Sequence, residues 1–181
     1  MNLRLLIIQN VLIILFCFIV LYLDQMEFKS THNALLVIFF SLVKSGFFVV
    51  MGFRKILYFS KSDLRYHHFL LFIGLSIGLM MVSFATDYFC LYQIDERSFA
   101  GIDPDVTLGE EIFKFFFFSV LIFSNLGVAS VVPSSIPAEF VMMTEGVLSF
   151  ITIILVLSDF ISLKESLQGI QKKLKTPAKQ D

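Results

Sequence analysis

The chain has few of the features that identify a soluble or catalytic domain. It contains two cysteines, Cys17 and Cys90, and both lie in or at the end of apolar stretches, so the sequence predicts packed thiols and no disulfide framework. Charged residues make up 16% of the chain, and its net charge of −1 gives no electrostatic reason to expect direct binding of nucleic acid. The sequence also lacks a Cys, His or carboxylate group with metal-site spacing, a phosphate-binding loop and a nucleophile–base pair. We therefore expect neither an enzyme nor a bound cofactor or metal.

Hydrophobic residues, by contrast, account for 57% of the chain, above the roughly 45–50% that is usual in soluble domains. They gather in five runs, each close to the roughly 20 residues that cross a bilayer core. These runs are Leu3–Leu23, Ala34–Phe53, Phe69–Leu91, Ile112–Val132 and Ala138–Ile161. The first run lacks an Ala-x-Ala cleavage site, so we expect a retained helix rather than a signal peptide. The sequence thus predicts an all-α integral membrane protein in contact with membrane lipids.

Basic residues predict which connections face the cytoplasm, because short cytoplasmic loops are enriched in Lys and Arg. They gather in the loop 54–68 and after Ile161, whereas the loops 24–32 and 92–111 have one each. If Ile112–Val132 crossed the bilayer, the basic C-terminal segment would lie outside. The charges therefore favour four transmembrane helices, a fourth run that enters and returns on the same side, and both termini in the cytoplasm.

The local sequence around the fourth run agrees with this topology. The stretch Thr107-Leu-Gly-Glu110 is a capping box that predicts a helix beginning at Leu108. Four residues then interrupt the helical pattern: Asn125, Gly127, Ser130 and Pro133. This pattern is typical of a half-membrane helix followed by an irregular return. The alternative is an ordinary fifth helix that contains Lys114 and Asn125.

Residues 69–161 resemble the pore module of tetrameric potassium-type channels: a span, an acidic outer loop, a pore helix, a return segment and an inner span. In that family the filter reads Thr-Val-Gly-Tyr-Gly-Asp and is followed, after two further residues, by Pro. The filter-like positions here are Asn125, Leu126, Gly127, Val128, Ala129 and Ser130, with Pro133 in place. The resemblance implies a homotetramer. It also implies a division into two N-terminal helices (1–68), the pore module (69–161) and a basic amphipathic tail (162–181).

The departures from the filter pattern bear on conduction. Potassium selectivity needs a ladder of backbone carbonyls, which is built with glycines that adopt unusual φ and ψ. Gly127 is present, but Ala129 stands at the second glycine position. We therefore expect a channel-like fold whose conduction chemistry is changed or lost.

Polar residues within the apolar runs are functional candidates by default. Four of them share one face of the last helix by their spacing: Glu145, Ser149, Thr152 and Asp159. Two interpretations remain open. The face lines a fourfold axis, with a ring of four Glu145 carboxylates below the filter, or it is a polar seam between helices without a pore. For Lys44 we expect a buried ion pair with Glu145 or Asp87, the alternative being that its amine reaches the membrane interface.

The C-terminal segment has apolar residues at helical spacing, which predicts an amphipathic extension of the last span. These residues are Leu163, Leu167, Ile170 and Leu174. The amphipathic face either lies on anionic lipid or docks a cytoplasmic partner or a neighbouring subunit.

Two functions from different classes follow from these features. One is a conducting, poorly selective tetrameric cation channel. The other, favoured by the altered filter, is a non-enzymatic membrane sensor or scaffold that holds a cytoplasmic effector protein. In size, span count and tail the chain is similar to the membrane subunit of the Kiwa antiphage defence system. That resemblance implies the second function, in the inner membrane of a bacterium.

Overall fold

The computed structural model describes residues 31–59, 66–103, 105–127 and 130–175. Most of this part of the chain is helical: α2 (Thr31–Phe59), α3 (Tyr66–Ile94), α4 (Leu108–Phe123) and α5 (Ile136–Lys175). The short elements are the 3-10 helix η1 (Glu96–Ser98) and the strands β1 (Phe99–Ala100) and β2 (Val132–Pro133). The run Leu3–Leu23, predicted to be the first span, lies outside the described residues.

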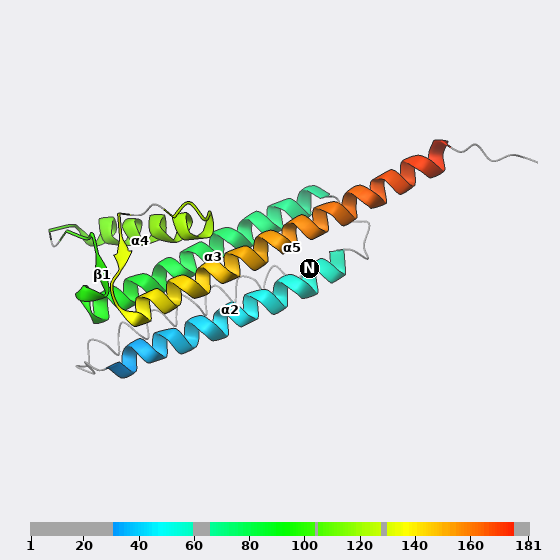
Figure 1. Ribbon diagram of the computed structural model, residues 1–181. Coiled ribbons are helices and arrows are strands. Elements are labelled where there is room, and N and C mark those ends of the chain that lie inside the picture. Colours follow the sequence, from blue (N-terminus) through cyan, green and yellow to red (C-terminus); the bar gives the residue numbers. More distant parts are fainter. Residues whose placement is uncertain (1–30, 60–65, 104, 128–129, 176–181) are drawn as a thin grey trace, which may run out of the picture.

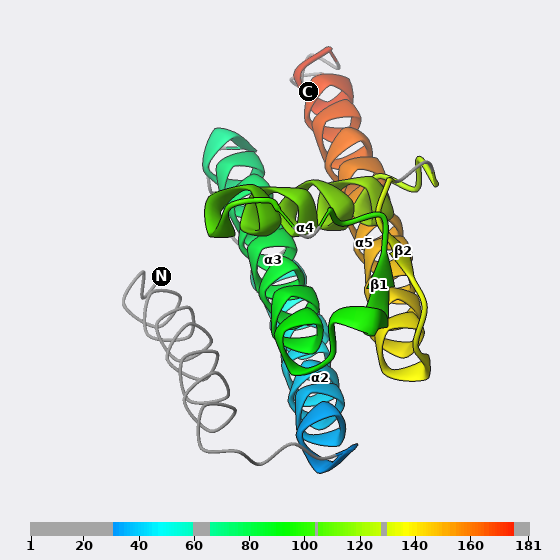
Figure 2. The same ribbon diagram turned by 90° about the vertical axis from the view of Figure 1, so that its left-hand side faces the viewer.

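The three long helices α2, α3 and α5 lie side by side, and α2 and α4 cover opposite faces of the α3–α5 pair (Figure 1, Figure 2). At one end of this bundle α3 ends, α2 and α5 begin, and η1, β1 and β2 are found (Figure 1). We call this the loop end, and its described residues are 95–103, 105–107 and 130–135. The helix α4 begins at the loop end and runs obliquely away from it, across α3 towards α5 (Figure 1, Figure 2).

Two helices are long and apolar enough to cross a membrane: Ile73–Ile94 within α3, with 22 residues, and Ile136–Ser158 within α5, with 23. At a rise of 1.5 Å per residue they span about 33 Å and about 35 Å, enough for a hydrocarbon core of about 30 Å. A shorter apolar stretch, Ala34–Val50, lies within α2. The described part of the protein is therefore mostly helical, with two candidate membrane spans.

The core lies towards the loop end and is rich in aromatic side chains. Phe115 and Phe118 of α4 are almost fully buried against Tyr88 of α3 and Phe99 of β1. The rings meet edge to face, with centroids 4.9 Å apart for Tyr88 and Phe118 and 5.1 Å apart for Phe99 and Phe115. Such pairs contribute about 0.5–1.5 kcal/mol each beyond the burial of their area. This packing holds α4 against α3 and β1.

Candidate functional site

The segment around α4 forms a hairpin whose two ends meet at the loop end. The strand β1 precedes α4, β2 follows it, and the two pair antiparallel with Phe99 opposite Pro133 and Ala100 opposite Val132. The helix itself has 16 residues, so it is about 24 Å long and shorter than a bilayer core of about 30 Å. The chain therefore leaves the loop end along α4 and is back at the loop end by β2 (Figure 1, Figure 2). We call β1, α4, β2 and the described residues between them (101–103, 105–107, 124–127, 130 and 131) the hairpin.

The start of α4 confirms the capping box expected from the sequence. Thr107 is the N-cap residue, and α4 begins at Leu108. The Glu110 carboxylate accepts hydrogen bonds from the Thr107 backbone N–H at 2.8 Å and from the Thr107 hydroxyl at 3.0 Å. The bond from the backbone N–H, together with that from the hydroxyl, lowers the pKa of Glu110 below its ordinary value.

This lowered pKa predicts that the first turn of α4 loosens in acid. A depressed carboxyl pKa stabilises the folded state fully above the ordinary value of 4.5, and that contribution is lost as the pH falls through the lower folded-state pKa. Hydrogen exchange of residues 105–112, corrected for the intrinsic pH dependence, should therefore speed up below about pH 4.5. In Glu110→Gln the protection of the turn should not change with pH over this range. Equal pH dependence in both proteins would contradict the role of the carboxylate.

The filter-like segment leaves the helical conformation where the sequence predicts. Asn125 has φ 55° and Gly127 has φ 68°, both in the left-handed region, and α4 ends at Phe123. Leu126 is 64% exposed, while the Asn125 side-chain amide lies 3.5 Å from the Ser149 hydroxyl. Ser130 is exposed at the return to β2. Val128 and Ala129 lie outside the described residues, so the predicted path of the filter-like carbonyls is described only in part.

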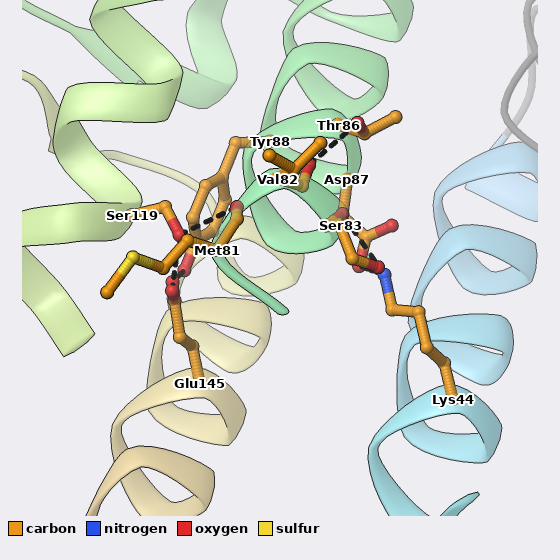
Figure 3. A network of polar contacts seen from close by, with 9 residues as sticks. All are labelled: Lys44, Met81, Val82, Ser83, Thr86, Asp87, Tyr88, Ser119 and Glu145. Carbon is orange, nitrogen blue, oxygen red and sulfur yellow. Dashed lines mark hydrogen bonds and ion pairs between the residues drawn. The ribbon is translucent and has the colours of Figure 1, made fainter. Parts of the chain in front are cut away.

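Glu145 on α5 has no exposed surface, and its carboxyl group lies between three helices. Tyr88 of α3 reaches one carboxyl oxygen, with Oη 2.5 Å from Oε2. Ser119 of α4 reaches the other, with Oγ 2.5 Å from Oε1, and the same hydroxyl lies 3.0 Å from the Met81 carbonyl oxygen of α3 (Figure 3). We call Met81, Tyr88, Ser119 and Glu145 the Glu145 cluster. It joins three helices at the depth of the apolar stretch of α5.

A second polar contact lies on the other side of α3 (Figure 3). Lys44 Nζ of α2 is 2.5 Å from Asp87 Oδ2 and 3.1 Å from the Ser83 carbonyl oxygen. It also lies 5.1 Å from the centre of the Phe84 ring, within the range of a cation–π contact. Of the two partners predicted for Lys44, the structure thus places Asp87 against it, while Glu145 bonds to Tyr88 and Ser119 instead.

The other predicted pore-lining residues lie as follows. Ser149 is fully buried and donates to the Phe123 carbonyl oxygen at 2.6 Å, at the end of α4. Thr152 is half-buried and donates to the Leu148 carbonyl oxygen within α5. The face that Glu145 and Ser149 share is therefore covered by α4 of the same chain, because both side chains find hydrogen-bond partners there. The side chain of Asp159 lies outside the described part.

The open face of α5 is apolar instead. Its exposed large side chains follow one another at helical spacing: Met143, Val147, Phe150, Ile154 and Leu157. Phe150 is 62% exposed and Leu157 is 57% exposed. The α5 backbone stays helical through Lys175, which includes the predicted docking positions, but their side chains are not among the described ones. Those positions are Leu163, Leu167, Ile170 and Leu174.

Two residues of the site are not apparent from the sequence alone: Tyr88 and Ser119. Each lies in an aromatic-rich apolar run, where burying a hydroxyl group without a hydrogen-bond partner costs free energy. A hydroxyl group in such a run therefore indicates that a polar partner lies nearby in the fold. Within the described residues, no group of three or more His, Cys, Asp or Glu side chains is placed to hold a metal ion. Comparison with protein-family models, curated proteins and solved structures gives no match to this chain.

Proposed function

We propose that the protein is a non-enzymatic membrane sensor or scaffold with a channel-like fold. In this proposal each subunit has four transmembrane helices, with the hairpin as a re-entrant segment, and four subunits assemble around α5. Both termini lie in the cytoplasm of a bacterium, and the C-terminal part of α5 holds a soluble effector. The observation that carries the proposal is the hairpin, because a helix too short to span is returned to its starting end by the pairing of β1 with β2.

The sensor or scaffold function is favoured over a conducting pore by the surface of α5. A subunit that lines a water-filled axis needs polar groups on its free face, and rings of apolar side chains exclude water from a narrow pore. Here Glu145 and Ser149 are covered by α4, and the free face carries Phe150, Ile154 and Leu157. An assembly of subunits around this apolar face has no water at its centre and therefore conducts no ions. A function that depends on a bound partner protein is consistent with such an assembly.

Planar-bilayer recording of the purified full-length protein tests this proposal. We expect no current above that of protein-free bilayers from the wild type, because the apolar centre stays dry. Phe150→Asn, which places a polar group on the free face of α5, should produce a current. Phe117→Asn, a change of the same kind at an exposed position of α4, serves as the matched control and should stay silent. Sustained current from the wild type would establish the alternative, a poorly selective cation channel, and silence of Phe150→Asn would contradict the central position of α5.

The partner is tested by two truncations. Deletion of residues 163–181 should abolish co-purification of the effector from the native bacterium, whereas deletion of residues 176–181 alone should preserve it, because the docking positions end at Leu174. A bacterium that loses the gene should also become more sensitive to phage, as the proposed place in antiphage defence requires. An unchanged set of co-purified proteins and unchanged phage sensitivity would together contradict the scaffold function.

A further inference from the structure

The Glu145 cluster contains three close oxygen–oxygen contacts, and each needs one hydrogen. They join Tyr88 Oη to Glu145 Oε2 at 2.5 Å, Ser119 Oγ to Glu145 Oε1 at 2.5 Å, and Ser119 Oγ to the Met81 carbonyl oxygen at 3.0 Å. Tyr88 and Ser119 each have one hydroxyl hydrogen, and a backbone carbonyl has none. Two hydrogens are therefore available from the surroundings of Glu145 for three contacts.

Among the groups of the cluster, the third hydrogen can come only from the carboxyl group itself. A protonated carboxyl group is both a donor and an acceptor. If Glu145 Oε1 carries the proton, it donates to Ser119 Oγ, and the Ser119 hydroxyl is then free to donate to the Met81 carbonyl. Tyr88 donates to Oε2. Every oxygen of the cluster then has a partner, with no pair of bare acceptors facing each other.

The charges around the cluster agree with a neutral Glu145. A buried carboxylate normally needs a cation, because an unpaired charge in an apolar interior costs several kcal/mol. Among the described residues, the lysines that form ion pairs are Lys44, with Asp87, and Lys114, with Asp103. On α2 and α3, Lys44 and Asp87 lie on the other side of α3 and pair with each other, so that their opposite charges largely cancel at Glu145. On α4, the charged residue nearest to Ser119 in sequence is Lys114, and on α5 Glu139 is exposed.

We propose that Glu145 is a proton-binding site. In the folded protein the Glu145 carboxyl group carries a proton, and this proton holds α4 against α3 and α5. When the proton leaves, Ser119 has to donate to the carboxylate, and its contact with the Met81 carbonyl becomes one between two acceptors. An unpaired negative charge remains among apolar side chains. Both changes weaken the attachment of α4, so the position of the hairpin is coupled to the occupancy of this site.

Infrared spectroscopy of the full-length protein in lipid vesicles tests the proposal, because the C=O stretch of a protonated carboxyl group is separate from those of carboxylates and amides. At neutral pH the wild type should show this band. Glu145→Gln should lose it, and the matched control Glu139→Gln, on the exposed side of the same helix, should keep it. Absence of the band from the wild type, or its persistence in Glu145→Gln, would overturn the proposal.

A second variant covers the case in which Glu145→Gln does not fold. Ser119→Ala removes the acceptor of the Glu145 proton but leaves the carboxyl group, so the band should shift to higher wavenumber. A band at an unchanged position would overturn the proposal. As the pH is raised, the wild-type band should disappear, and hydrogen exchange of residues 108–123 should speed up over the same pH range. If the band disappears while the exchange rate stays the same, the proposed coupling between the Glu145 proton and α4 is refuted. The infrared experiment depends neither on ion conduction nor on a partner protein. Its result can therefore contradict the proton-binding site without contradicting the proposed function, and the reverse also holds.

Discussion

Replacing Lys44 with methionine is expected to lower the free energy of unfolding by about 3–5 kcal/mol, the cost typical of removing one partner of a buried ion pair. Methionine keeps most of the length and apolar contact of the lysine side chain, so the loss comes from the charge. Asp87, whose side chain is only 16% exposed, would lose its partner at 2.5 Å, and it would then have to bear an unpaired charge or take up a proton, both of which cost free energy. Unfolding by SDS in mixed micelles, followed by circular dichroism, measures the change.

The matched control for this prediction is the double variant Lys44→Met/Asp87→Asn. It removes both charges, so it should recover most of the stability lost in Lys44→Met, because replacing a buried pair by neutral groups is often close to neutral. A lysine whose amine reaches the membrane interface instead would give a different pattern. In that case Lys44→Met would cost little, and the double variant would be no more stable than the single one.

The helix boundaries near the hairpin were predictable because their signals are local. A capping box involves residues three positions apart, and it places the start of α4 at Leu108. The break after Phe123 likewise follows from residues that tolerate left-handed backbone, Asn125 and Gly127. These features depend on neighbouring residues, so they can be inferred without the rest of the fold.

The partners of Glu145 were not predictable in the same way. Tyr88 is 57 residues from Glu145, and Ser119 is 26 residues from it, so their contacts depend on how three helices cross. Helical periodicity correctly places Glu145 and Ser149 on one face, but it does not reveal which element covers that face. The structure shows that α4 does so, and this changes the expected environment of Glu145 from a free face to the interior of the folded chain.

Replacing Gly101 with alanine is expected to open the hairpin. Gly101 directly follows β1 and has φ +89°, a conformation that costs a residue with a side chain about 1–3 kcal/mol. A Cβ atom there would lie 1.9 Å from the Ser130 carbonyl oxygen, so the return segment would have to move as well. Because the pairing of β1 with β2 closes the hairpin, this movement should loosen the whole segment from 124 to 133.

Gly109→Ala is the matched control, since Gly109 lies in the first turn of α4 and a Cβ atom there would meet nothing within 4 Å. Its stability should be unchanged or slightly higher, because alanine favours the helix over glycine by about 0.5–1 kcal/mol. Unfolding in SDS and hydrogen exchange of residues 124–133 should therefore separate the two variants. If both behave alike, the close approach of Gly101 and Ser130 does not hold the hairpin. If hydrogen exchange of residues 124–133 speeds up in Gly101→Ala alone, the return of the chain from α4 to the loop end depends on glycine at position 101.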